Sequence, residues 1–228
     1  RIPIGSNIRG RRLSAGERDA WRAQAGYDPN DFVLAYFGFL NPSKGGLALI
    51  RTLHRLVQVQ PNTQLLMIGE QVGASDTGNN AYWQEVQALI AKLGLADRVR
   101  WTGNLPDAEV AAALNACDVL LMPYTDGASL RRGTLMAGLA NGCAIVTTTP
   151  QAPLPELQDG RDLLYTPPED PAAMAAAALQ LAGNPALRAE LGEHARARSA
   201  LFAWDAIARA HWEQYTRVAA ADGRRHEA

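Results

Sequence analysis

Two adjacent arginines, Arg131 and Arg132, stand near the start of a helix that the sequence predicts over about residues 130–141. The N-terminus of a helix already has partial positive charge, so two cations are unfavourable there unless they reach solvent or an anion lies between them. Guanidinium groups bind phosphate oxygens in pairs, which suits a diphosphate. The sequence therefore allows either a solvated pair or a diphosphate-binding pair.

The rest of this loop contains groups that suit a sugar or a phosphate. Asp126 precedes Gly127, a combination typical of turns, and its carboxylate could equally accept hydrogen bonds from sugar hydroxyls. We expect Ser129 to cap the helix that follows. Leu130 and Thr134 complete the candidate ligand-binding residues of this loop.

A second candidate site contains Lys44, in the segment 38–46. Ser43 can cap a helix that begins there, and the two glycines after Lys44 place a cation beside exposed backbone N–H groups, which favours phosphate. A merely solvated lysine fits the same pattern. The segment is not a Walker loop, and it lacks the three-glycine dinucleotide fingerprint, which argues against a nicotinamide enzyme.

Both segments follow predicted strands within a repeating strand–helix pattern. Short apolar runs predict six strands, at 32–38, 64–69, 98–103, 119–123, 144–148 and 162–165. Helical spacing predicts one helix that begins at about residue 43 and a second between the polar loop 75–80 and Gly94. Five more are predicted over about 106–116, 130–141, 171–183, 186–199 and 204–219. This alternation predicts an α/β fold with a doubly wound, Rossmann-like, six-stranded parallel sheet covered on both faces.

In such folds ligands bind beyond the carboxyl ends of the strands. Gly38, Gly69 and Thr102 lie at the ends of three predicted strands and are therefore candidate ligand-binding residues. No internal boundary is predicted. Residues 1–30 are expected to form an approach segment with one helix near 15–24, residues 31–220 the binding domain, and residues 221–228 a polar tail.

The composition is that of an ordinary globular protein. The 228 residues are 47% apolar and 20% charged, and the formal net charge of −1 gives no indication of nucleic acid or membrane as a partner. No apolar run is long enough to cross a bilayer, and the chain opens without a signal peptide or an initiator Met. We expect a cytoplasmic protein and a chain that is a fragment or has been processed.

Neither the cysteines nor the histidines form a metal-like pattern. Cys117 and Cys143 lie in apolar context, as small buried thiols do, and the four histidines form no ligand pair. We therefore expect no metal and no cofactor.

The order of these segments resembles the C-terminal domain of family 4 (group 1) glycosyltransferases, which have the GT-B fold. The resemblance extends from Ile2 to Tyr215 and rests on the segments 38–45, 66–70, 97–103, 116–123, 141–147 and 202–204. In that family this domain binds a nucleoside diphosphate sugar, and a separate N-terminal domain, missing here, holds the acceptor. The resemblance implies transfer with retention of configuration and without a metal, and it leaves membrane contact only to the missing domain.

The resemblance also implies roles for particular residues. Lys44 matches the family lysine that contacts the donor diphosphate, and the backbone of residues 127–130 matches the loop that cradles phosphate and sugar. Lys44 and Asp126 are the expected catalytic residues. Asp126 stands in for the first of two family glutamates only if this loop is about two residues longer.

The chain departs from the family pattern at two positions. Phe39 stands where an arginine is usual, and the second glutamate, which holds the ribose hydroxyls, falls on Ala137. A hydrogen bond to a charged group contributes about 1.5–3 kcal/mol, so this loss should weaken nucleotide binding. Our hypothesis is that the additional Arg131 and Arg132 compensate for Phe39. Alternative functions are a GT-B module that no longer catalyses and serves in binding or assembly, and a sugar-nucleotide epimerase.

Overall fold

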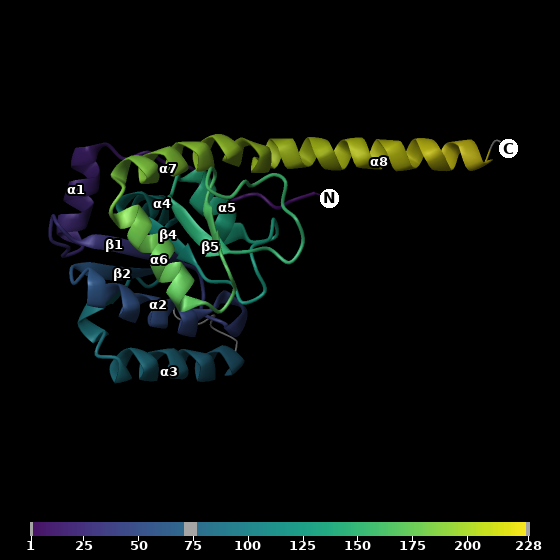
Figure 1. Ribbon diagram of the computed structural model, residues 1–228. Helices are drawn as coiled ribbons and strands as arrows, with labels where there is room; N and C mark the ends of the chain where they lie inside the picture. Colours follow the sequence, from purple (N-terminus) through teal and green to yellow (C-terminus); the bar gives the residue numbers. More distant parts are fainter. Residues whose placement is uncertain (1, 71–76, 227–228) are drawn as a thin grey trace.

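The computed structural model describes residues 2–70 and 77–226 and contains one six-stranded sheet (Figure 1). The strand order is β3-β2-β1-β4-β5-β6, and every neighbouring pair is parallel. The strands are β1 Phe32–Phe37, β2 Thr63–Ile68, β3 Val99–Trp101, β4 Val119–Met122, β5 Ile145–Thr148 and β6 Leu164–Thr166. The predicted fold class is confirmed, with strand ends within about two residues of the predicted ones.

Helices cover both faces of the sheet. They are α1 Ala15–Gln24, α2 Gly46–Val59, α3 Thr77–Lys92, α4 Asp107–Ala116, α5 Gly133–Ala140, α6 Pro171–Ala182, α7 Pro185–Ser199 and α8 Trp204–His226, with short 3-10 helices at Pro42–Lys44, Ala96–Arg98 and Ala200–Phe202. Helices α2, α3 and α6 pack on one face, and α1, α4 and α5 pack on the other.

Alternation along the strands builds a separate core on each face. Val33 and Ala35 of β1 belong to the core under α4 and α5, whereas Leu34 and Tyr36 belong to the core under α2 and α6. Successive side chains of a strand point to opposite faces, so a strand covered on both sides must be apolar throughout. This requirement explains why the central strands β1, β2 and β4 are apolar runs in the sequence.

Four helix boundaries differ from the predicted ones, and the first is that of α2, which begins at Gly46 and not near residue 43. Helix α3 begins at Thr77, so residues 77–80 are helical where a loop was predicted, and residues 75–76 of that loop lie outside the described residues. Short polar residues suit the first turn of a helix as well as a loop, so their composition did not separate the two. Helix α5 begins only at Gly133. Helix α8 continues to His226, through much of the expected polar tail, because three consecutive alanines at 219–221 favour the helix.

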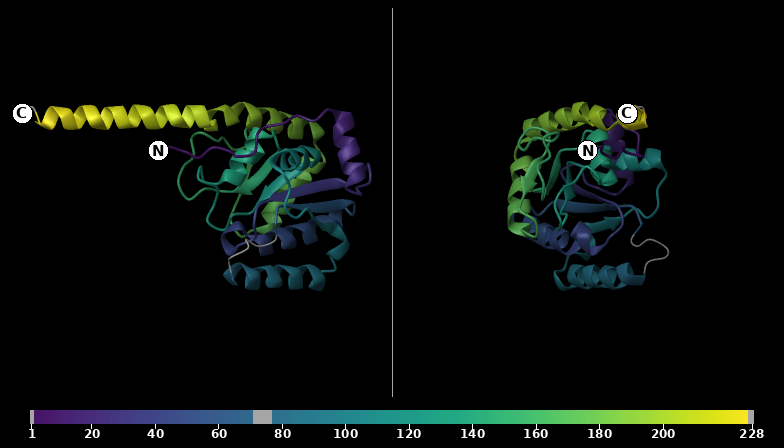
Figure 2. Two further views of the ribbon diagram at one scale, coloured as in Figure 1. Left: turned by 180° about the vertical axis from the view of Figure 1, so that it is seen from behind. Right: turned by 90° about the vertical axis from the view of Figure 1, so that its right-hand side faces the viewer.

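Helix α8 extends well beyond the body of the molecule (Figure 2). Its projecting part exposes Trp212, Tyr215 and Val218. The N-terminal segment, by contrast, is bonded to the body: Ile4 N–H donates to Leu130 O at 3.1 Å, and Trp204 Nε1 donates to Ser6 O at 2.9 Å. Within residues 2–70 and 77–226, no helix is both long and apolar enough to cross a membrane.

Candidate functional site

The centre of the sheet is its topological switch point. From the adjacent strands β1 and β4, the chain continues outward in opposite directions, to β2 and β3 on one side and to β5 and β6 on the other. In open α/β sheets, ligands bind at the carboxyl ends of the strands where the order reverses in this way. The loops after β1 and β4, which contain Lys44 and Asp126, are therefore the place to examine.

These two loops pack tightly against each other. Thr125 N–H donates to Ser43 O at 3.0 Å. Gly45 has φ +69°, and a Cβ added there would lie 1.8 Å from Pro123 O, so only glycine fits. The first of the two glycines after Lys44 thus has a structural reason, which is the close approach of the β4–α5 loop.

Lys44 lies directly across Gly38, the residue that follows β1. A Cβ on Gly38 would stand 2.8 Å from Lys44 Nζ, and Gly38 has φ +116°. Asn41 fixes the turn before Lys44, because its Oδ1 accepts the Lys44 N–H at 3.2 Å. The predicted cap by Ser43 is wrong: the Ser43 hydroxyl donates to Asn41 Oδ1 at 2.8 Å, and α2 has Gly45 as its N-cap residue.

The Lys44 ammonium has no carboxylate partner within residues 2–70 and 77–226. Burial lowers the pKa of Lys44 below its ordinary value, and the nearby Arg132 guanidinium lowers that pKa further. The ring of Phe39 lies 6.0 Å from Nζ. A half-buried cation next to a second cation is a site that an anion would stabilise.

Arg132 joins the loop after β4 to the same region. Its guanidinium pairs with the Asp126 carboxylate and stacks over Tyr124, with Cζ 4.6 Å from the ring centroid. The Tyr124 hydroxyl and Thr134 Oγ1 are 2.8 Å apart. Thr134 Cγ2 in turn would contact a Cβ on Gly38 at 3.0 Å. A continuous set of contacts therefore connects Asp126 and Arg132 to Gly38.

The two arginines precede α5 instead of forming its first turn. Arg132 is the N-cap residue, and no side chain caps the helix. The predicted cap of α5 by Ser129 is wrong. The Ser129 Oγ accepts Arg131 N–H at 3.2 Å, and the Ser129 carbonyl accepts Arg132 N–H at 3.1 Å. This extra turn delays the helix by three residues. Arg131 is exposed, whereas Arg132 is held against Tyr124.

The turn before α5 leaves several backbone donors unused. No hydrogen bond among the described residues uses the N–H groups of Ser129, Leu130, Gly133 or Thr134. Thr134 Cγ2 and Lys44 Nζ both lie near the position that a Cβ of Gly38 would take, so the start of α5 lies close to the Lys44 ammonium. Free N–H groups at a helix N-terminus form an anion site with the helix dipole.

Gly127 shapes the earlier part of the same loop. It has φ +79°, and a Cβ there would lie 2.4 Å from Thr149 O. The N–H groups of Gly127 and Ala128 are occupied, since they donate to Tyr124 O at 3.4 Å and to Thr148 O at 3.0 Å. Gly127 therefore holds the loop against β5, and the free donors lie further along the chain.

Gly69 and Thr102 form a second part of the carboxyl edge. Gly69 N–H donates to Thr102 Oγ1 at 3.0 Å, and the Thr102 hydroxyl donates to Gly103 O at 2.8 Å. A Cβ on Gly69 would lie 3.8 Å from the backbone of Gly38. Thr102 thus fixes Gly69 next to Gly38, and its own hydroxyl is already used.

Two residues that sequence reasoning missed hold this arrangement together. The Tyr36 hydroxyl donates to Phe39 O at 3.1 Å, and Tyr124 supports both Arg132 and Thr134. Burial raises the pKa of Tyr124 to about 12, so it is a neutral phenol at physiological pH. Tyr36 lies in a predicted apolar strand and Tyr124 in the loop after another, and no spacing signal marked either as part of the site.

Ala137, where the family pattern has a glutamate, belongs to α5, and its side chain is buried in the core. In the part of the chain that the structure describes, no three His, Cys, Asp or Glu side chains gather as metal ligands do.

The comparisons with known proteins agree with this geometry. A family model for glycosyl transferases group 1 matches residues 31–184, and the chain belongs to this family. Similar curated relatives are D-inositol 3-phosphate glycosyltransferases. The protein from Streptomyces avermitilis is 28% identical over 92% of this chain and 45% of its own length, and the protein from Streptomyces scabiei is 29% identical over 93% and 47%. The chain thus spans about half the length of the curated relatives it matches.

Solved structures agree on the fold. The Anabaena Alr3699/HepE structure in complex with UDP and glucose has a TM-score of 0.80 at 24% identity, over 94% of this chain and 56% of that one. Sucrose-phosphate synthase from Thermosynechococcus elongatus has a TM-score of 0.80 at 25% identity, over 96% and 52%. These neighbours are GT-B glycosyltransferases, and this chain has the fold of their C-terminal half.

Proposed function

We propose that this chain is the donor-binding half of a glycosyltransferase, and that it binds a nucleoside diphosphate sugar for retaining transfer to an acceptor held by a separate N-terminal domain. The observation that supports this most directly is the position of Lys44. Its ammonium is half-buried, lacks a carboxylate partner among the described residues and lies at the topological switch point.

In this proposal the site stabilises the charge that develops on the departing diphosphate. Lys44 and Arg132 supply two positive charges, and the free N–H groups of Ser129, Leu130 and Gly133 supply donors that need little reorganisation. Arg132 can remain paired with the Asp126 carboxylate while it binds a phosphate, because a guanidinium has five N–H donors. With this charge provided by side chains, we propose that the donor binds without a metal or a further cofactor.

We assign the remaining candidate residues by their positions along the carboxyl edge. The Asp126 side chain is 51% exposed and would accept hydrogen bonds from hydroxyl groups of the donor sugar. Gly38 and Gly69, adjacent and without side chains, would leave room for the diphosphate and the nucleoside, and Thr102 would maintain that spacing. Gly127, Leu130 and Thr134 would shape the sugar-binding loop through their backbones, whereas the exposed Arg131 would reach a phosphate only if its side chain turns inward.

Calorimetric titration with UDP, GDP, ADP and TDP tests this proposal. One nucleotide should bind selectively, and Lys44→Ala should weaken that binding by roughly tenfold or more, because a charge-assisted hydrogen bond is lost. Arg217→Ala is the control, since it removes an exposed cation on α8, away from the candidate site, and should leave the affinity unchanged. The proposal fails if no nucleotide binds to the complete protein, or if both variants behave alike.

A catalytically inactive binding module is the second candidate. Ala137 favours it, because a buried alanine provides no carboxylate for a ribose, and so does Phe39 in place of an arginine. Product analysis on the complete protein separates the two functions. Release of free nucleoside diphosphate together with a glycosylated product indicates a transferase, and nucleotide binding without any turnover indicates the module.

A further inference from the structure

A groove of about 1270 Å³ lies on the outer face of the helical layer formed by α2, α3 and α6. Helix α2 forms its floor, α3 forms one wall, and Glu169 and Pro171 at the start of α6 form the other. Pro42, Gly45 and Thr125 close one end, so the groove begins behind the loops of the candidate donor site. Lys44 is not among the residues that line it.

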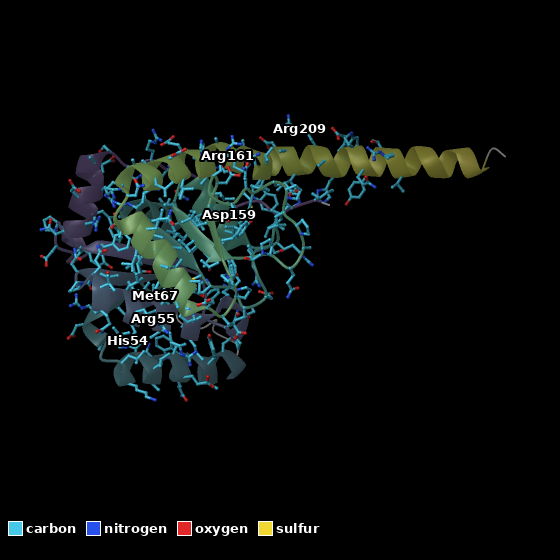
Figure 3. The ribbon with its side chains drawn as sticks, in the orientation of Figure 1. His54, Arg55, Met67, Asp159, Arg161 and Arg209 are labelled. Atoms are coloured by element: carbon cyan, nitrogen blue, oxygen red, sulfur yellow. The ribbon has the colours of Figure 1, made fainter. Side chains whose placement is uncertain are left out.

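The α2 residues in the groove form one stripe along the helix. Leu47, Arg51, His54, Arg55 and Gln58 line it, and their spacing of three or four residues places them on one face. Figure 3 marks His54 and Arg55 on α2, near α3. From residue 47 to residue 58 the helix rises about 16 Å, so the groove could hold an extended small molecule.

The groove has an excess of positive charge. Arg51 and Arg55 follow one another by one helical turn, a spacing at which like charges destabilise a helix, and Lys92 joins them from α3. None of these three cations forms an ion pair within residues 2–70 and 77–226. Glu169 is the single carboxylate among the described residues that line the groove.

Two local features are unusual for an unoccupied surface. The Nδ1 atom of His54 is buried and has no hydrogen-bond partner among the described residues, a state that folded proteins generally avoid. Glu169 has φ +55° and is the non-glycine residue with positive φ in the described chain. Strained backbone of this kind is often retained at binding sites.

The helix dipole explains only one of the cations in the groove. Lys92 lies at the end of α3, where a positive charge stabilises the dipole, but Arg51 lies in the middle of α2 and does not interact favourably with a helix end.

We propose that this groove binds a small multivalent anion, a molecule with two or more phosphate or carboxylate groups, at a site separate from the donor site. Arg51, Arg55 and Lys92 bind the anionic groups. The apolar residues Leu47 and Leu89 contact the carbon skeleton, and Glu169 keeps the anionic groups away from its own end of the groove.

Calorimetry with inorganic tripolyphosphate tests this inference, because the probe needs only anion recognition. All titrations use a Lys44→Ala background, which weakens the proposed donor site, so that a loss of affinity caused by the groove arginines does not depend on the proposed function. Adding Arg51→Gln and Arg55→Gln should weaken tripolyphosphate binding by at least about tenfold. Both arginines are exposed, so the variant should fold, which circular dichroism would verify.

The control adds Arg209→Gln and Arg217→Gln to the same background. These two arginines are exposed on α8, so the control makes the same change in net charge far from the groove (Figure 3 marks Arg209). It should change the affinity by less than about twofold at constant ionic strength. Equal weakening in the two variants would mean nonspecific attraction and would overturn the inference, as would a lack of tripolyphosphate binding in the Lys44→Ala background.

Discussion

The two ends of β4 each place one carboxylate among several cations, but with opposite results. Before the strand, Asp118 lies within 4 Å of Arg18, Arg22 and Arg188. After the strand, Asp126 pairs with Arg132, and Lys44 stands nearby without a carboxylate partner among the described residues. Positive charge exceeds negative charge at both ends, so charge alone does not distinguish them.

Burial and hydrogen bonding do distinguish them. The Asp118 side chain is only 7% exposed, and its Oδ2 also accepts Val33 N–H at 2.8 Å, so that carboxylate is saturated. Arg18 and Arg22 come from α1, and the cluster therefore fastens α1 to the amino end of the sheet. At the carboxyl end Asp126 is half exposed, and the adjacent backbone donors are unused. A saturated charge cluster stabilises the fold, whereas an unsaturated one is available to a ligand.

The comparison is tested most strongly by removing each carboxylate. Asp118→Ala should lower the free energy of unfolding by about 3–5 kcal/mol, because it leaves the buried Arg22 guanidinium without its counter-charge. Asp126→Ala should cost less than about 1 kcal/mol, because the Asp126 side chain is half exposed and Arg132 keeps its contact with Tyr124. Urea unfolding of both variants measures the difference. Similar losses would show that the two clusters do not differ as we argue.

The next largest effect should separate the two arginines of the carboxyl end. Arg132→Ala should weaken binding of the preferred nucleoside diphosphate by roughly tenfold, because Arg132 is held over Tyr124 beside Lys44. Arg131→Ala should change the affinity by less than about twofold, because its side chain is exposed. Calorimetry on the single and double variants measures both. Unchanged affinity in the double variant would refute compensation for Phe39.

The pH dependence of binding should sharpen the assignment of Lys44. Its folded pKa lies below 10.5, and a bound diphosphate would raise that pKa by favouring the ammonium. Affinity should therefore fall as the pH rises through the lowered pKa, by about tenfold for each unit by which binding raises it. Titrations between pH 7 and 10.5 measure this change. Lys44→Met should bind weakly throughout and lack this step; a wild-type profile that stays flat would contradict the role of Lys44.

The sheet was predictable from the sequence because its strands are buried on both faces. The central strands β1, β2, β4 and β5 read as short apolar runs, whereas the edge strand β3 includes the exposed Arg100, and the alternation with helices then determines a parallel sheet. Helix starts were less predictable. Ser129 and Ser43 both have the residue type of a cap, but each is occupied by a local turn, and a single sequence does not reveal which bonds a hydroxyl forms.

The candidate site was predictable in its residues but not in its contacts. Lys44 and Gly38 stood out by type and position, yet their contact depends on how the turn at Asn41 returns the side chain over the strand end. The stacking of Arg132 on Tyr124 depends on where α5 begins, which the periodicity placed three residues too early. Long-range contacts of this kind leave no periodic signal.

The smallest expected effect concerns the stability of the carboxyl end without any ligand. Lys44→Met removes a half-buried ammonium that Arg132 repels while keeping the length of the side chain, so we expect a gain of up to about 1 kcal/mol in the free energy of unfolding. Lys92→Met, at an exposed position, should change it by less than about 0.5 kcal/mol. Urea unfolding at pH 7 compares the two. If Lys44→Met instead lost stability, the lysine would be a structural residue like Arg22, and the distinction between the two ends of β4 would disappear.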